Sequence, residues 1–284
     1  MSMDFSSWIG RSRTEADIVS LAPMRGLASL LDRDPVQVKE GQAVSPTACW
    51  LYFLPFVRQS EIDRDGHPRR GGFLPPVDLP RRMWAGSRME IGEALRIGDA
   101  IERTSTILDV SEKGGRSGRL IFIAVQHEIS GPRGLALRER QDIVYREPPQ
   151  DGAAATTPPA EDIPAFDLTR TFEPDPVKLF RFSALTFNGH RIHYDRDYAR
   201  QQEGYRDLVV HGPLVATLLL DLAGEAAADR RLSGFTWRGK RPAYGDAALT
   251  LGARKTGPDE LELLAVGPDG ITMEARATLS ARAG

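Results

Sequence analysis

The chain has 284 residues, a net charge of −2 and a single cysteine, Cys49. Near-balanced charge argues against a general nucleic-acid-binding surface, and one cysteine excludes an internal disulfide and suits a reducing compartment. The N-terminal segment contains no apolar stretch long enough for a signal peptide or a membrane span, so we expect a cytoplasmic protein that binds neither membranes nor nucleic acid.

The N-terminal half is predicted to contain one apolar helix followed by strands. The helix is expected from Pro46 to Val57, where apolar residues are dense. Strand-like segments follow at 101–110, 120–130 and 135–147, and the Gly-rich run from Gly114 to Gly118 is typical of a hairpin turn. This half has no histidine around its predicted helix, so we expect it to shape a substrate pocket rather than to transfer protons.

The second half is predicted to repeat this order after a linker. Residues 147–164 are rich in Pro, Ala and Thr and lack periodicity, which divides the chain into domains 1–146 and 165–284. An apolar helix is expected from Pro213 to Ala228, followed by strands at 248–255, 261–266 and 271–280. The length also predicts about two domains of the usual ~150 residues, and periodicity alone indicates two duplicated α+β domains.

The segment from Phe182 to Pro213 holds three of the five histidines. Asn188-Gly189 predicts a turn in which Gly189 takes positive φ, and Asp195 is suited to cap a polar helix running to Glu203. Pro213 is favoured at the first position of the next helix, whose free N–H groups attract negative charge. A histidine base and an oxyanion site are therefore expected close together, which suits proton transfer next to a carbonyl.

These residues resemble the MaoC-like hydratases and dehydratases. The family signature runs Asp-x-Asn-Pro-x-His and is followed by His-Gly and a long apolar helix. The matching frame here is Asn188-Gly189-His190-Arg191-Ile192-His193, with His211-Gly212 after it. Asn188 replaces the family's aspartate and His190 its asparagine. This variant, together with the run from Tyr52 to Gly86, is most similar to hydroxyacyl-thioester dehydratases of type 2 and mesaconyl-C4-CoA hydratases.

The resemblance implies an α+β double hotdog fold, in which each domain wraps an antiparallel sheet around a central helix. It implies an enzyme that reversibly hydrates an enoyl-CoA thioester, mesaconyl-C4-CoA to citramalyl-CoA first, with itaconyl-CoA hydration or general 3-hydroxyacyl-thioester dehydration as alternatives. His193 would be the base, and the Gly212 N–H would stabilise enolate charge. Asn188 would hold water, and His190 or Asp195 would be the second proton-transfer group. No cofactor beyond the CoA of the substrate is expected, and a homodimer is one expected assembly.

Cations for a dicarboxylate acyl group and for CoA phosphates are also expected near this site. Arginine's planar fork suits a carboxylate, and either basic residue can meet a phosphate. Most arginines in such a charged chain lie in solvent, which is the competing interpretation. The substrate-binding candidates are Arg81, Arg82, Arg191, His211, Arg238, Lys240 and Arg241.

Three other interpretations compete. His190, His193 and His211 could supply zinc ligands, although the helical spacing typical of such sites is absent and no metal is expected. Cys49 could be a nucleophile only with a histidine from the other domain, and a buried inert thiol is the simpler interpretation. Finally, the loss of the family aspartate at Asn188 is compatible with a scaffold that binds acyl-thioesters without turning them over.

Overall fold

The computed structural model describes residues 4–115, 118–147 and 161–281. Its five short 3-10 helices are η1 Ser6–Trp8, η2 Pro35–Gln37, η3 Pro46–Leu51, η4 Gln59–Glu61 and η5 Arg191–His193. The α-helices are α1 Leu21–Leu30, α2 Pro176–Leu185, α3 Arg196–Gln201 and α4 Gly212–Ala226. The strands are β1 Ser12–Ile18, β2 Arg81–Ile91, β3 Ala100–Gly115, β4 Gly118–Gly131, β5 Gly134–Arg146, β6 Leu168–Phe172, β7 Arg231–Gly239, β8 Leu249–Gly257, β9 Glu260–Gly267 and β10 Gly270–Ser280.

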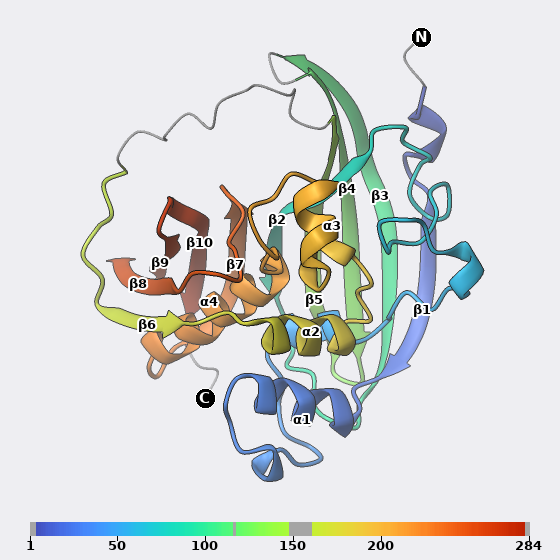
Figure 1. The fold of residues 1–284 in the computed structure, drawn as a ribbon. Helices are drawn as coiled ribbons and strands as arrows, with labels where there is room; N and C mark the ends of the chain where they lie inside the picture. The colour runs from blue at the N-terminus through green and yellow to red at the C-terminus, as the bar shows by residue number, and fades with distance from the viewer. Residues whose placement is uncertain (1–3, 116–117, 148–160, 282–284) are drawn as a thin grey trace.

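All ten strands form one antiparallel sheet in the order β1-β3-β4-β5-β2-β7-β10-β9-β8-β6. Reading outwards from its centre, the first half runs β2-β5-β4-β3-β1 and the second runs β7-β10-β9-β8-β6. The two orders are equivalent, and β2 pairs with β7 at the point where the halves meet. Figure 1 shows β1, β3, β4 and β5 on the right and β6 to β10 on the left, with helices between them. The expected duplication is confirmed.

The predicted strands are confirmed because their hydrophobic patterns match their surroundings. β10, for example, alternates buried and more exposed residues along most of its length, as a strand with one face on a core requires. The strands predicted at 101–110, 120–130 and 135–147 correspond to β3, β4 and β5, and those of the second half correspond to β8, β9 and β10. The short β1 and β6 and the joining strands β2 and β7 were not predicted.

The helix α4 is the central helix of the second half. Its residues are buried almost without interruption from Leu214 to Leu220, and it packs against β7, β8, β9 and β10. The prediction of a helix from Pro213 to Ala228 is therefore confirmed within two residues. Because α4 begins at the inner face of the sheet, its N-terminus points into the interior of the protein rather than into solvent.

The first half has no equivalent long helix at its predicted position, and the prediction of a helix from Pro46 to Val57 is wrong beyond Leu51. The chain there forms η3, and Phe53 has a φ of 54°. Pro55 explains the early end, because the residue before a proline is disfavoured in helical conformation. The α-helix of this half is instead α1, which packs against α2. Residues of this segment, among them Trp50, Phe53 and Val57, line a cavity.

The boundary between the halves lies between the end of β5 at Arg146 and the start of β6 at Leu168. The linker predicted for 147–164 falls mainly on residues 148–160, which lie outside the described residues. Within the three described ranges, no helix is both long and apolar enough to cross a membrane.

Candidate active site

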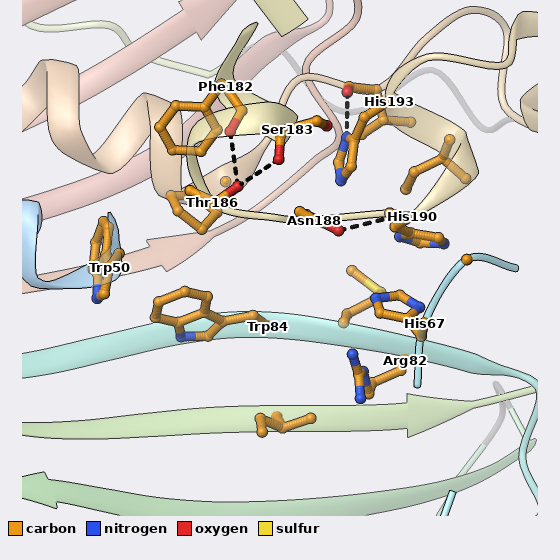
Figure 2. Close-up of a pocket in the computed structure, with 18 of the residues that line it drawn as sticks. Trp50, His67, Arg82, Trp84, Phe182, Ser183, Thr186, Asn188, His190 and His193 are labelled. Carbon is orange, nitrogen blue, oxygen red and sulfur yellow. Dashed lines mark hydrogen bonds between the residues drawn. The ribbon is translucent and has the colours of Figure 1, made fainter. Parts of the chain in front are cut away.

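A cavity of about 960 Å³ lies between the two halves, and the loop that follows α2 forms one of its walls. Aromatic side chains from both halves cover much of its surface: Trp50, Tyr52, Phe53, Trp84, Phe182 and Trp237. Trp50, Tyr52 and Phe53 come from the first half, which was expected to shape an acyl pocket. The four predicted catalytic residues also line the cavity: Asn188, His190, His193 and Gly212. Figure 2 shows the histidines on one side of the cavity and Trp50 and Trp84 on the other.

His193 is held as a neutral base. Its Nδ1 lies 2.7 Å from the carbonyl oxygen of Val209, so Nδ1–H donates and Nε2 carries the free lone pair. Figure 2 shows that second nitrogen on the cavity side of the ring. Burial, and then the neighbouring His211 and His190, hold the pKa of His193 well below its usual value. A neutral imidazole facing the cavity is the state that can accept a proton from water.

Gly212 is the first residue of α4, so its N–H has no acceptor within the helix. It lines the cavity together with His193, and the helix dipole adds to its attraction for negative charge. The site thus combines a proton acceptor with a preformed donor for a developing oxyanion.

His211 was predicted as a substrate-binding residue, and the structure instead places it behind His193. The two rings stack with centroids 3.6 Å apart, and His211 Nε2 lies 2.9 Å from Ser183 Oγ. Its side chain does not cap α4, and it is absent from the cavity lining. Burial lowers the pKa of His211 to about 3, so it is a neutral support that fixes the plane of the His193 ring.

Asn188 forms the expected turn, but the positive φ falls at Phe187, with a φ of 48°, rather than at Gly189. The Asn188 Oδ1 accepts a hydrogen bond from the His190 N–H, which leaves its amide nitrogen as the donor at the cavity wall. Gly189 is needed for a different reason. A Cβ built on Gly189 would lie 2.7 Å from the carbonyl oxygen of Gly66, so a loop of the first half packs directly on the motif.

That loop brings two functional groups that the sequence analysis missed, Asp65 and His67. Asp65 Oδ2 lies 3.0 Å from His67 Nδ1, and the His67 ring lies 4.1 Å from the ring of His190. Burial, and then the charges of Arg82 and His190, outweigh Asp65 and lower the pKa of His67 to about 3. Burial is the largest single influence on Asp65 and opposes its ionisation, but the hydrogen bonds and charge of His67, together with the charge of His190, outweigh burial and lower the pKa of Asp65. An Asp-Gly-His turn was the available signal.

His190 lies between the missed pair and the base. Its ring is 5.5 Å from that of His193, and its Nε2 lies 3.3 Å from Glu203 Oε1. Ligand-capable atoms of Asp65, His67 and His190 all lie within 4.8 Å of one another, so these three residues could meet one metal ion. The zinc set considered from the sequence is different. Two of its nitrogens are engaged, His193 Nδ1 by Val209 and His211 Nε2 by Ser183.

The predicted cations divide into three groups. Arg82 lines the cavity and has no hydrogen-bond or ion-pair partner among the described residues. Arg81 also lines it, but its guanidinium contacts the Glu203 carboxylate and main-chain oxygen. Lys240 and Arg241 line it while pairing with Glu274 and Glu161, respectively.

Two predicted cations, and two other candidates, lie elsewhere. Arg191 pairs with Asp195 at 2.7 Å, and Arg238 is exposed on β7; neither lines the cavity. Asp195 caps α3 and is held by Arg191, so the proposal that it is a second proton-transfer group is not supported. Burial raises the pKa of the Cys49 thiol well above its usual value, which disfavours a nucleophilic thiolate.

The family model for hydroxyacyl-thioester dehydratase type 2 matches residues 47–245. The chain belongs to the hydroxyacyl-thioester dehydratase type 2 family. A mesaconyl-C(4)-CoA hydratase from Chloroflexus aurantiacus is 46% identical over 273 residues, which cover 95% of this chain and 96% of that protein. This family membership makes the chain an enzyme and confirms the sequence resemblance.

Solved structures agree on the fold of this dehydratase family member. A MaoC-like dehydratase from Phytophthora capsici superposes with a TM-score of 0.66 at 15% identity, covering 97% of both chains. A Mycobacterium tuberculosis protein described as a double hotdog fold superposes with a TM-score of 0.59 at 13% identity, covering 95% of this chain and 96% of that one. The double hotdog architecture is confirmed, with its N-terminal helix reduced to η3.

Proposed function

We propose that this enzyme reversibly hydrates an enoyl-CoA thioester, with mesaconyl-C4-CoA as the substrate and citramalyl-CoA as the product. The observation that carries the proposal is His193, whose Nδ1 is fixed on Val209 while Nε2 faces the cavity beside Gly212. The C. aurantiacus relative, a mesaconyl-C(4)-CoA hydratase by name, supports the choice of acyl group.

In the proposed reaction, His193 Nε2 accepts a proton from water while the water oxygen bonds to the β-carbon. The thioester oxygen then carries enolate charge, which the Gly212 N–H and the N-terminus of α4 stabilise. The Asn188 amide nitrogen is positioned to hold water or substrate by a hydrogen bond, because its oxygen is occupied by the His190 N–H. Hydration is redox-neutral, so these groups need no cofactor beyond the CoA carried by the substrate.

The free carboxylate of a dicarboxylyl group would bind Arg82. Arg82 is half-buried at the cavity wall and is unpaired among the described residues, whereas Arg81 and Arg191 are engaged by carboxylates. A buried guanidinium without a partner gains most from a bidentate carboxylate. Lys240 and Arg241 would mark the side of the cavity where the CoA phosphates lie.

The substrate is tested by comparing mesaconyl-C4-CoA, itaconyl-CoA and crotonyl-CoA with the wild-type enzyme and with Arg82→Met. Loss of enoyl-thioester absorbance gives kcat/KM for each. We expect the wild type to prefer mesaconyl-C4-CoA over crotonyl-CoA by about 10²-fold or more, since the monocarboxylate leaves a buried charge unpaired. Arg82→Met should remove that preference.

Equal turnover of mesaconyl-C4-CoA and crotonyl-CoA by the wild type would contradict the dicarboxylate assignment. It would favour the general 3-hydroxyacyl-thioester dehydratase that the family name describes. A cytoplasmic location and a homodimeric state stay predictions from the sequence, and light scattering coupled to size-exclusion chromatography tests the second.

A further inference from the structure

The first half of the chain places a carboxylate–imidazole pair at the cavity wall. Asp65 binds His67 twice, through Oδ1 to the main-chain N–H at 2.8 Å and through Oδ2 to the ring Nδ1 at 3.0 Å. The His67 side chain is 17% exposed, and the residue lines the cavity. A carboxylate in this position fixes the ring, keeps the hydrogen on Nδ1 and stabilises the imidazolium when the ring gains a proton.

Backbone contacts between the two halves fix this pair against the catalytic motif. The Arg191 N–H donates to the Asp65 carbonyl oxygen at 2.9 Å. Gly66, which separates Asp65 from His67, has a φ of 93°, and a Cβ built on it would lie 1.8 Å from the Gly189 carbonyl oxygen. His67 is therefore held beside His190 by main chain on both sides, as a catalytic group must be.

We propose that His67, oriented by Asp65, is the second proton-transfer group of the active site and exchanges the α-proton of the thioester substrate. This inference rests on the proposed hydration reaction. In that direction His193 Nε2 takes one proton from water, and the oxygen bonds to the β-carbon. The carbon–carbon π electrons become the enolate, and the α-carbon takes a proton from His67 Nε2. A proton then passes from His193 to His67 through solvent, so that one water is added overall.

His67 fits this role better than His190 does. The Asp65 carboxylate has no arginine partner among the described residues, so its charge is available to the His67 imidazolium. The Glu203 carboxylate beside His190 is shared with Arg81, and its bond to His190 Nε2 is longer, at 3.3 Å. The site also lacks a carboxylic acid at Asn188, where the resembling family has aspartate. The Asn188 amide cannot act as an acid, and His67, from the first half of the chain, would supply the proton instead.

Proton chemistry also fits this cluster better than metal binding does. The unpaired Arg82 acts on His67 as a like charge, and a divalent cation would meet the same repulsion. The His67 and His190 rings face each other with centroids 4.1 Å apart and an interplanar angle of 41°, a tilted stack. Metal ligands instead turn their in-plane nitrogens towards one point.

Arg82 connects the charge of the substrate to the protonation of His67. Its positive charge is the largest contribution after burial to the lowered pKa of His67. A substrate carboxylate paired with Arg82 would cancel that charge and raise the pKa of His67, which favours the protonated ring in the complex. A dicarboxylyl substrate would thus favour protonation of the acid that acts on it, and a monocarboxylic analogue would lose kcat as well as binding.

The test compares His67→Gln and Asp65→Asn with Asp63→Asn, a matched control in the same loop whose exposed carboxylate is not part of the cavity lining. Hydration of mesaconyl-C4-CoA is measured for kcat and KM against pH, and α-proton exchange of citramalyl-CoA is followed in D₂O. His67→Gln should lower kcat by about 10²-fold or more and lower exchange with it, with KM nearly unchanged. Asp63→Asn should behave as the wild type.

Asp65→Asn tests the pH dependence of kcat, which would not change if Asp65 and His67 had only a structural role. Without the carboxylate the imidazolium is less stable, so the basic limb of kcat should move to lower pH. If His67→Gln does not fold, the isosteric Asp65→Asn variant still tests whether His67 transfers a proton. Wild-type kcat in His67→Gln, an unmoved limb in Asp65→Asn, or activity abolished by a chelator and restored by zinc would overturn the inference. If the wild type hydrates no enoyl-CoA, the proposed function itself fails; if it does and the variants match it, only this inference fails.

Discussion

At the scale of single residues, the site depends on which nitrogen of each histidine is occupied. His193 binds Val209 through Nδ1, and His211 binds Ser183 through Nε2. His193 therefore has a free nitrogen at the cavity, whereas His211 is held behind the His193 ring. Two histidines of one motif therefore have different roles because their hydrogen-bond partners differ.

Gly212 offers a test of the oxyanion donor, because its N–H can be removed with little change in backbone. Proline is suited to the first turn of a helix, and the preceding His211 has a ψ of 126°, which a following proline tolerates. Gly212→Pro should therefore lower kcat by about 10²- to 10³-fold. Gly212→Ala keeps the N–H, and its added Cβ would lie 3.8 Å from the Trp237 ring, an ordinary contact.

The alanine variant should keep kcat within about an order of magnitude of the wild type, since the oxyanion donor is intact. Stopped-flow hydration assays and thermal melts of both variants separate catalysis from folding. Equal activity of the proline and alanine variants would show that the Gly212 N–H does not act on the substrate.

Local sequence was sufficient to find the residues that one loop carries, and insufficient to find their partners. Asn188, His190, His193 and Gly212 line the cavity because they follow one another along the motif that starts at the end of α2. Arg191 belongs to the same motif, yet its side chain turns to Asp195. Spacing along the chain does not reveal that direction, because a 3-10 turn places successive side chains on different sides.

At the scale of elements, the decisive contact joins the loop at 63–68 to the motif at 188–191. Asp65 and His67 lie more than a hundred positions upstream of the motif, in a segment with no strand or helix period. Only the fold brings the two loops together, so no pattern within either segment could predict that they meet. The helix predicted to Val57 failed for a local reason, Pro55, which the sequence did contain.

The close packing of Gly66 on Gly189 should matter more to activity than its conformation alone. Gly66→Ala places a Cβ 1.8 Å from the Gly189 carbonyl oxygen, so one loop must move. Gly41→Ala is the matched control, because Gly41 also has positive φ, at 78°, but a Cβ there meets nothing within 4 Å. We expect Gly66→Ala to lower kcat by about 10²-fold, the cost of a misplacement of about 1 Å.

The control should lose stability through backbone strain, on the order of 1–2 kcal/mol, while keeping its kcat. Urea unfolding and steady-state kinetics on both variants make the comparison. A Gly66→Ala enzyme with normal kcat would show that the two loops need not touch for catalysis.

At the scale of the whole molecule, the two half-sheets have equivalent strand orders but pack against different helices. In the second half α4 packs against the sheet, whereas the corresponding segment of the first half forms only the short η3, and residues from this segment and from the motif line one cavity. The duplication could be predicted from the repeated order of β3, β4 and β5 and of β8, β9 and β10, since each of these strands was marked by its own pattern. The unequal filling was missed, although Pro55, which ends the N-terminal helix early, was present in the sequence.

Four imidazoles in this shared interior have lowered pKa values, which should make the fold sensitive to acid. Burial is the largest cause of the lowered pKa of His67, His127, His193 and His211. An unfolded chain takes up protons at these histidines as pH falls below about 6.5, whereas the folded chain does not until much lower pH. Their contribution to the free energy of unfolding is therefore present above about pH 6.5 and is lost as pH falls towards the folded pKa values.

We accordingly expect the free energy of unfolding to fall between pH 7 and pH 5.5 by on the order of 1 kcal/mol for each of these histidines. Urea unfolding at the two pH values measures the difference. His127→Gln is the informative variant, because His127 bonds Ser105 in the first half and lies outside the catalytic motif. It should reduce the difference by about one histidine's share, on the order of 1 kcal/mol. A wild type equally stable at both pH values would mean that these imidazoles take up protons as readily in the folded protein as in the unfolded chain, so that burial does not lower their pKa values.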